Sequence, residues 1–461
     1  MDETPLLDQF VGFLAEAKAV FKDPRTARRV CEMGVACIAA DSPKTITSLV
    51  EFNGTHGSLE LNRGDWSASY RMLSTGKWEQ EELSWALLDM ALGFVGPGEP
   101  IVVLVDDTIL RKTGHCVLGC AYARDPLSPP FQTNLVWGQR TLCVSILIRS
   151  SATSAYRSVP LFFQLTPAVR FPSKASPEER ASLVELRKKN RMSVAARALV
   201  DRIRARLDEI GLGGRKLVVC GDGSFANRAF MYAPPHDTAM VCRCRNDLRL
   251  FRPLATDERR GRRVYGERLQ TPAEFARDPG RPEEALEFGV MHQHARVSCR
   301  TMGDVRWPTA LKRQPCSILV VRGQCYRKHG RRRTTEPAFL VMTGDVEGLG
   351  GTPDGAVRRA TLLEAYLLRW EIEVGFRDQK NWLGVGKAQV RNAVSVKRTP
   401  AFMSASYAML LMAAMKAFDD KRTSHFRPLP KWRSVAPQRP SIRDLVERLR
   451  REVRIRGRVA G

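Results

Sequence analysis

The sequence is poor in the residues from which several kinds of site are built. It has 7 histidines in 461 residues, and its 11 cysteines include no CxxC pair. The closest groupings are His115-Cys116 with Cys120, Cys242 with Cys244, and His292-His294 with Cys299. Structural zinc sites need paired ligands at short spacing, and an odd, scattered set of cysteines does not form a disulfide framework. We therefore expect reduced cysteines and ordinary histidines.

Long apolar runs are also missing. No stretch reaches the roughly 18 apolar residues of a transmembrane helix. The nearest, AFMSASYAMLLMAAM at 401–415, contains two serines and leads into Lys416, so a buried helix is expected. The opening residues MDETPLLDQF lack the basic start and apolar stretch of a signal peptide. The expectation is a cytoplasmic protein with no membrane partner.

Negative charge is scarce relative to positive charge. Asp plus Glu number 49 and Lys plus Arg 74, which gives a net charge of +25. Hydrophobic residues make up 43 %, so a mainly disordered chain is excluded. Such a charge needs nucleic acid, an anionic membrane surface or another polyanion as its partner. No amphipathic anchor accompanies the basic residues, which favours nucleic acid.

Residues 1–95 carry a helical pattern, for example at Phe10, Phe13 and Leu14. Within 65–92, aromatic and basic residues occur together. This pattern fits a helical bundle with core aromatics, and it also fits a helical module that contacts DNA. Composition does not choose between the two.

A strand-rich pattern begins after Gly96. The run IVVLV at 101–105 is typical of a buried central strand and leads into Asp106, Asp107 and Thr108. Further strands are expected at 141–148, 159–165, 216–220 and 239–244, with a long, charged, helix-forming region over 176–210. The strand at 216–220 leads into Gly221-Asp222-Gly223. Three strands followed by alternating helices and strands is the ribonuclease-H-like order, so we predict an α/β fold with a mixed sheet and flanking helices.

Residues 247–336 interrupt this order. They are rich in arginine, proline and glycine, with basic runs at 259–263 and 327–333 that are either solvated loops or phosphate contacts. A strand at 338–343, a long helix at 356–383 and an apolar helix at 400–417 follow. We predict an N-terminal helical region at 1–95, a catalytic domain in two parts at 96–246 and 337–420, a β-rich insertion at 247–336, and a basic tail at 421–461.

The helix near residue 370 is the most informative segment. Tyr366, Arg369, Glu373 and Lys380 fall within a stripe about 60° wide at 100° per residue. A surface ladder of salt bridges would explain this stripe. Asp107 and Asp222 favour a different explanation, because each follows a buried strand. Two aspartates and a glutamate from separate elements supply the oxygen ligands that a pair of Mg²⁺ ions needs for phosphodiester chemistry.

The order DDT, then GDG, then Y-x2-R-x3-E-x6-K resembles the DDE transposases of bacterial insertion sequences, specifically the group named for its Y-R-E-K signature. Tyr366, Arg369, Glu373 and Lys380 match that signature in full. The long separation between Asp222 and Glu373 is also similar, because members of the group insert a β-rich domain there. Alternation along the strand sends Asp106 and Asp107 to opposite faces, and the group's pattern, with threonine directly after the ligand, selects Asp107.

The resemblance implies a ribonuclease-H-like fold and two Mg²⁺ ions, for which Mn²⁺ is expected to substitute. Asp107, Asp222 and Glu373 would be the metal ligands. Tyr366, Arg369 and Lys380 would contact phosphates near the scissile bond. It implies cleavage at the ends of an insertion sequence and strand transfer into target DNA by a homodimer in a synaptic complex, close to the bacterial nucleoid. The alternatives are an inactive, transposase-derived DNA-binding regulator and a nuclease without strand transfer.

Overall fold

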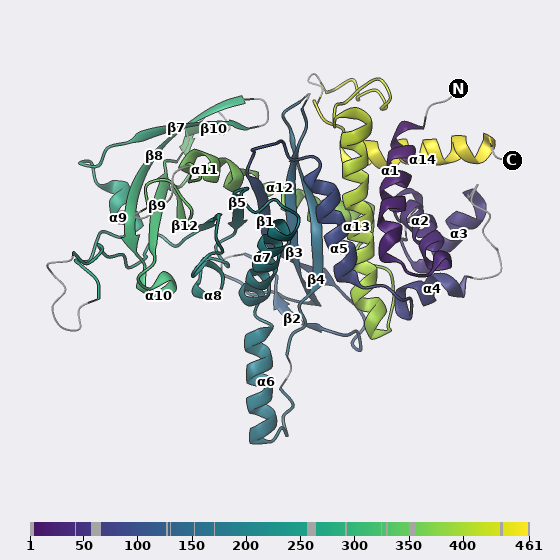
Figure 1. Ribbon diagram of the computed structural model, residues 1–461, viewed down its shortest axis with the longest axis horizontal. Coiled ribbons are helices and arrows are strands. Elements are labelled where there is room, and N and C mark those ends of the chain that lie inside the picture. Colours follow the sequence, from purple (N-terminus) through teal and green to yellow (C-terminus); the bar gives the residue numbers. More distant parts are fainter. Residues whose placement is uncertain are drawn as a thin grey trace. The chain divides into compact units, whose positions relative to one another are not determined.

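The computed structural model describes residues 4–459, apart from 42, 57–65, 126–127, 130, 152, 170, 256–263, 291–292, 324, 329–330, 350–355 and 434–436. The chain forms two compact units (Figure 1). Unit 1 comprises Met1–Gly96, Asp107–Asn190 and Glu371–Gly461, and unit 2 comprises Pro97–Asp106 and Arg191–Trp370. Each unit is assembled from segments that are far apart in the sequence.

The central element of unit 1 is α13 (Ala393–Phe418). It packs on β4 (Tyr156–Leu165) and on three helices from the start of the chain, α1 (Pro5–Glu16), α2 (Pro24–Ala39) and α5 (Gln80–Leu92). By length and composition α13 could cross a membrane, but 83 % of its most apolar window is buried inside the structure. A helix that is apolar all round and packed on every side is a core helix, so the predicted buried helix is confirmed.

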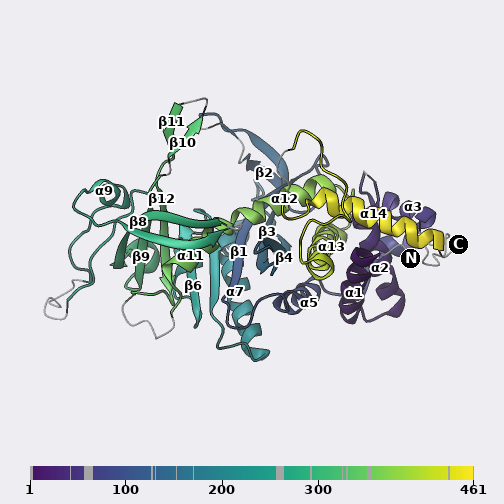
Figure 2. The same ribbon diagram turned by 90° about the horizontal axis from the view of Figure 1, so that it is seen from above.

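The C-terminal segment folds back onto the first helices of unit 1. Its helix α14 (Ile442–Val459) lies along α1 and α2 (Figure 2). Arg450 donates hydrogen bonds to the carbonyl oxygens of Ala39 at 2.9 Å and Ala40 at 2.8 Å, which end α2. Glu452 accepts one from the amide of Leu7 at 2.7 Å. Part of the positive charge of 421–461 therefore satisfies helix ends within unit 1.

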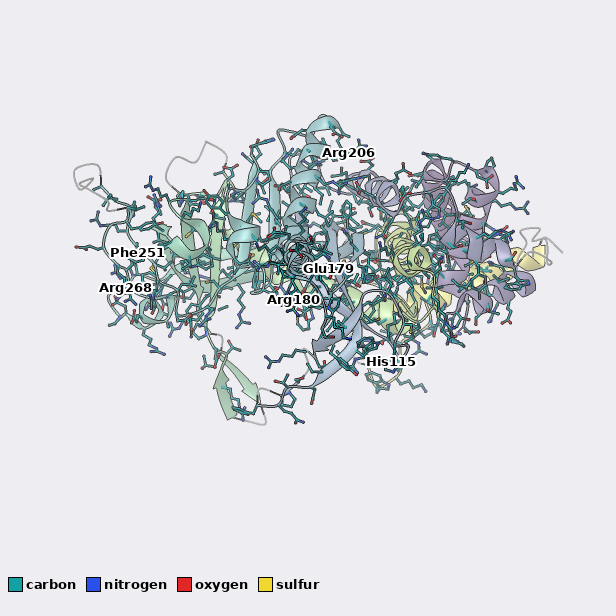
Figure 3. The ribbon with its side chains drawn as sticks, turned by 90° about the horizontal axis from the view of Figure 1, so that it is seen from below. His115, Glu179, Arg180, Arg206, Phe251 and Arg268 are labelled. Atoms are coloured by element: carbon teal, nitrogen blue, oxygen red, sulfur yellow. The ribbon has the colours of Figure 1, made fainter. Side chains whose placement is uncertain are left out.

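The remaining helices of unit 1 are short or exposed. They include α3 (Ile46–His56), α4 (Ser67–Ser74), the 3₁₀ turn η1 (Ala17–Val20) and α6 (Pro177–Lys189). Ser176 and Glu179 form a capping box at the start of α6, where Glu179 and Arg180 are labelled in Figure 3. No side chain of α6 is buried. The helix-forming region predicted over 176–210 contains two helices, and the second, α7 (Met192–Glu209), belongs to unit 2.

One mixed sheet has the strand order β2-β3-β1-β5-β6-β12-β9-β8-β7, with β4 paired to β3. In unit 1, β2 (Cys120–Arg124) and β4 pair antiparallel with β3 (Leu135–Arg149), and the strands predicted at 141–148 and 159–165 lie within β3 and β4. In unit 2, residues 101–106 of β1 (Ile101–Arg111), β5 (Leu217–Gly221) and β6 (Thr238–Arg243) are parallel, and β12 (Ala338–Gly344) is antiparallel to β6. The strands predicted at 101–105, 216–220, 239–244 and 338–343 are therefore found, and the mixed α/β class is confirmed.

Three strands from the predicted insertion extend this same sheet. β9 (Pro315–Val321) pairs with β12, β8 (Gln293–Arg306) pairs with β9, and β7 (Glu284–Val290) pairs with β8. The pair β10 (Cys325–Lys328) and β11 (Arg331–Thr334) forms a sheet of its own. Phe251 and Arg268, labelled in Figure 3, meet in an isolated bridge. The basic run 259–263, and residues 329 and 330 of the second run, lie outside the described residues.

Short helices complete unit 2. They are α8 (Arg228–Met231), α9 (Pro272–Arg277), α10 (Pro308–Leu311) and α11 (Arg359–Leu368). α11 packs on β5, β6 and β7. The long helix predicted over 356–383 is divided at Arg369, since α11 ends at Leu368 and α12 (Trp370–Trp382) follows. Arg369 keeps helical dihedral angles, φ −53° and ψ −30°, so the helical path changes little there.

Candidate active site

Two adjacent aspartates stand in the middle of β1. The first half of this strand is apolar and buried, and Asp106 and Asp107 follow it directly. Their side chains are 13 % and 16 % exposed, so both are largely shielded from water. Asp106 is the last residue of its segment of unit 2, and Asp107 is the first residue of its segment of unit 1. Successive residues of a strand point to opposite faces, so the two carboxylates face different surroundings.

Asp107 is engaged by an arginine of the neighbouring strand. Arg140 on β3 donates from Nε to one carboxylate oxygen at 2.7 Å and from Nη2 to the other at 2.8 Å. This two-pronged geometry is the strongest arrangement that an arginine and a carboxylate form. Arg140 was not predicted, because an ion pair between two strands leaves no periodic signal in the sequence.

Asp106 is engaged by an arginine of the Y-R-E-K signature. Arg369 donates from Nη1 to Asp106 Oδ2 at 2.8 Å within unit 2. The guanidinium of Arg369 also lies over the ring of Tyr366, 5.9 Å from its centroid. Burial raises the pKa of the Tyr366 hydroxyl, so this phenol stays protonated as a hydrogen-bond donor. Two of the four signature residues, Tyr366 and Arg369, thus lie together with Asp106, which the resemblance did not select as a metal ligand.

Asp222 follows the last residue of β5 and is oriented by its own turn. Its Oδ1 accepts hydrogen bonds from the amide of Ser224 at 2.9 Å and from the Ser224 hydroxyl at 2.6 Å. The glycine before it is required by packing: a Cβ at Gly221 would stand 2.9 Å from Cβ of Phe225 and 3.1 Å from Sγ of Cys242. Packing therefore requires the first glycine of the Gly-Asp-Gly element, and the carboxylate that follows it is held in a fixed position.

Glu373 and Lys380 are on α12 in unit 1. Glu373 lies in the first turn of this helix, and Lys380 donates from Nζ to the hydroxyl of Thr108 at 2.6 Å. Burial lowers the pKa of the Lys380 ammonium. The helix is held by a buried neighbour of the signature, Glu371, which accepts a hydrogen bond from Arg439 at 2.9 Å. Arg439 precedes α14, so the C-terminal segment helps to fix the position of α12.

A recess of about 250 Å³ opens beside Asp222 in unit 2. Its lining includes Gly223, the arginines Arg243 and Arg245, and the largely buried Trp307. The two arginines of this recess suit a phosphodiester backbone, because a guanidinium binds phosphate oxygens. Sequence reasoning did not single out these arginines, which lie in β6 and in the segment after it.

In the part of the chain that the structure describes, no group of three or more His, Cys, Asp and Glu side chains is placed to hold a metal ion, and this includes the carboxylates named above. Cys242, Cys244 and Cys299 are buried, and burial raises the pKa of each thiol, which agrees with the expectation of reduced core cysteines. His292 lies outside the described residues. The residues with the best chemistry for Mg²⁺ are the aspartates within β1 and directly after β5, because carboxylate oxygens are its preferred protein ligands.

Comparison with known proteins identifies a family for the chain. A family described as "DDE superfamily endonuclease" matches residues 25–302, which is more than half of the chain and includes β1 and β5. The match ends before α11 and α12, which carry the Y-R-E-K residues. Among curated proteins, none matches the chain.

Proposed function

Because the chain belongs to the DDE superfamily endonucleases, we propose that it is a transposase of the Y-R-E-K group. It would cut DNA at the ends of an insertion sequence and join those ends to target DNA. The family supports an endonuclease that acts on DNA. The transposase assignment rests on the four signature residues and on their partners at the strand ends.

The observation that carries this proposal is the position of the aspartates. Val105 of β1 pairs in parallel register with Gly221, the last residue of β5, and Asp106 and Asp222 come directly after these two residues in the chain. Chemistry in α/β sheets collects at the carboxyl ends of the strands. One aspartate of the Asp106–Asp107 pair, together with Asp222 and Glu373, would hold two divalent ions.

Bound ions of this kind polarise a phosphodiester and lower the pKa of the attacking water or 3′-hydroxyl. The protein's own cations would position the DNA. Arg369 and Lys380 would contact phosphates beside the scissile bond, and the Tyr366 hydroxyl would donate a further hydrogen bond. The net charge of +25 provides attraction for the duplex over a longer range. Synapsis of two ends would use two copies of the chain.

The alternatives make different predictions. A catalytically inactive regulator derived from such an enzyme would bind DNA without cutting it, and a nuclease would cut without joining. All the carboxylates needed for catalysis are present, and those at the strand ends are held by defined hydrogen bonds. This favours an active enzyme over the regulator.

The test is cleavage of a labelled duplex that carries an element end and its flank, incubated with purified protein and Mg²⁺ or Ca²⁺. We expect a product with a 3′-hydroxyl in Mg²⁺ only. Asp222→Ala should abolish this product and leave binding of the duplex, measured by gel shift, within about threefold. The matched control is Asp201→Ala, an exposed aspartate of α7, which should cleave normally. Binding of the duplex by the wild type with no product in Mg²⁺ would favour the regulator, and cleavage without joining to target DNA the nuclease.

A further inference from the structure

We propose that Tyr122 and Trp137 form a stacking platform for unpaired bases of DNA. The platform lies on strands β2 and β3 in unit 1, and His115, which is labelled in Figure 3, contacts it. The inference rests on the proposed function, because it takes DNA as the substrate. It adds a binding site that uses neither the carboxylates nor the signature residues.

Trp137 contacts two other aromatic rings. Its ring centroid is 5.0 Å from that of Tyr122 and 5.9 Å from that of His115. Tyr122 and Trp137 are opposite each other in the antiparallel pair of β2 and β3, so both side chains project from the same face. Rings at these distances attract one another, and the three side chains form one continuous aromatic group.

Hydrogen bonds hold the platform in place. Nε1 of Trp137 donates to the carbonyl oxygen of Gly114 at 3.0 Å. Two residues further along β3, Nε2 of Gln139 donates to the carbonyl oxygen of Leu118 at 2.7 Å. Both bonds tie the connection between β1 and β2 to β3. A platform that is formed in advance loses little conformational freedom when it binds a ligand.

Tyr122 is exposed although it has an aromatic neighbour. Its exposed fraction is 65 %, and Leu135, on the same face of β3 as Trp137, is 59 % exposed. Their position is at the edge of the sheet, where β2 is the outermost strand. Exposed apolar side chains on an edge strand promote aggregation, so a contiguous group of them indicates a surface that binds a partner.

The charge around the platform favours nucleic acid as that partner. Residues 110–139 include three basic side chains, Arg111, Lys112 and Arg124, and one acidic side chain, Asp125. Arg111 binds Asp125 at 2.8 Å, and this carboxylate is only 16 % exposed. Arg124 lies two residues after Tyr122 on the same face of β2. Aromatic rings flanked by cations match single-stranded nucleic acid, which offers bases for stacking and phosphates for ion pairs.

Stacking on Tyr122 requires a base that has left the duplex. Within a duplex each base is covered on both faces by its neighbours, and an enzyme that uses such a base must first unstack it. A paired base therefore cannot stack on the platform. Duplex DNA would meet only the basic residues around it, so the platform distinguishes single strands from duplexes.

The platform is within reach of the signature residue Lys380. Lys380 donates to the hydroxyl of Thr108, and Lys112 is four residues further along β1, a distance of about 14 Å. The amide of Lys112 donates to the carbonyl oxygen of Trp137 at 3.1 Å. A DNA strand rises about 3.4 Å per nucleotide, so the platform is about four base steps from a phosphate bound by Lys380. Bases that are released when the duplex opens beside the cut would stack there.

A comparison of two DNA probes tests the platform. They are a labelled oligothymidine of about 12 nucleotides and a blunt duplex of the same length, each titrated with the full-length protein and followed by fluorescence anisotropy. We expect Tyr122→Ala to weaken oligothymidine binding at least about fivefold and duplex binding by less than about twofold. Tyr122→Phe keeps the ring and should bind as the wild type does. Tyr122→Leu is apolar without a ring and should bind as weakly as Tyr122→Ala.

The matched control is Trp432→Ala, a tryptophan of unit 1 that is 81 % exposed and lies outside the platform. It should leave oligothymidine binding within about twofold of the wild type. Because Tyr122 is mostly exposed, its variants should melt within about 2 °C of the wild type, which excludes a folding defect. Photo-cross-linking of an oligothymidine that carries 5-iododeoxyuridine, followed by mass spectrometry, should place the base on Tyr122 or Trp137.

Oligothymidine binding that is unchanged in Tyr122→Leu, that falls equally in Trp432→Ala, or that falls together with duplex binding overturns the platform and leaves the proposed function intact. Cross-links found only outside β2 and β3 have the same consequence. Unchanged DNA binding with reduced self-association in sedimentation would make this surface a contact between copies of the chain, and also overturns the platform. A wild-type protein that binds neither probe overturns the proposed function itself.

Discussion

Arg369 donates a hydrogen bond to Asp106 although the two residues are 263 positions apart in the sequence. The contact joins Arg369, which follows α11, to the central strand β1 inside unit 2. Both side chains are largely shielded from water, at 14 % and 13 % exposure, so the ion pair is screened less than a surface pair would be. A guanidinium next to an acidic strand end can neutralise that carboxylate, and it can also bind a phosphate that approaches the same place.

Arg369→Ala should weaken binding of end DNA and reduce the slope of log affinity against log salt by about 1, since one phosphate contact is lost. Arg369→Lys should recover the charge and not the planar guanidinium, and should cleave more slowly than the wild type. Gel-shift titrations at four salt concentrations measure the slope. The control is Arg377→Ala, an arginine of α12 whose side chain is 65 % exposed. An unchanged slope with normal cleavage would remove the phosphate role of Arg369.

Lys380 should lose its charge at a lower pH than an ordinary lysine does, because burial lowers its pKa. Its attraction for phosphate is fully present below the lowered pKa and disappears as the pH rises through it. End binding should therefore decline at alkaline pH in the wild type. Lys380→Met should bind about tenfold more weakly at pH 7 and show a flatter decline, because the titrating charge is absent. Fluorescence anisotropy between pH 7 and pH 10 measures both curves. Identical pH profiles for the two proteins would contradict this prediction.

The buried ion pair between Arg157 and Asp420 should be costly to break. Arg157 binds both carboxylate oxygens, at 2.7 and 2.9 Å, and the side chains are 5 % and 0 % exposed. Asp420→Ala leaves a guanidinium without its counter-charge in the core of unit 1 and should lower the free energy of unfolding by about 3–5 kcal/mol. The control is Asp41→Ala, whose side chain is 81 % exposed, with an effect of about 0.5 kcal/mol or less. Urea unfolding followed by circular dichroism compares them, and equal losses would contradict a buried pair.

His236 should contribute stability that depends on pH. Hydrogen bonds to Asp237 and Asp208 raise the pKa of its imidazole above the usual 6.5. Its contribution is complete below pH 6.5 and is lost as the pH rises through the raised folded-state value. The side chain is 60 % exposed, so the effect is small, about 1 °C in melting temperature. Melting curves of wild type and His236→Ala should differ more at pH 6 than at pH 9. A difference that does not change with pH would contradict the prediction.

Much of the sheet was predictable because buried strands carry a local signal. The run at 101–105 and the strand before Asp222 are continuous stretches of apolar residues, which a central parallel strand requires. The strand β2 was missed because CAYAR is short and only its first residue is buried. Helix ends were harder to predict. No proline or glycine marks the interruption of the helix at Arg369, where the amide of Arg369 donates a hydrogen bond to the carbonyl oxygen of Tyr366.

The partners of the site residues could not be predicted. Arg140 and Asp107 form a pair across two strands, and Arg369 reaches Asp106 from a distant helix, so neither contact follows from a periodic pattern. Strand alternation did predict that Asp106 and Asp107 have different surroundings. Which face meets the signature helix is decided by packing, and only the structure shows it. Similarly, the composition of residues 247–336 indicated β structure, but it did not show that β9 pairs with β12.

The position of α13 has a consequence for how the chain is made. The apolar sides of α1 and α2 are buried against a helix that begins only at Ala393. A ribosome that has translated the first 300 residues has released these two helices without the surface that they need. The emerging chain must keep them from aggregating until α13 has been made, so a product that stops before Ala393 cannot complete this unit.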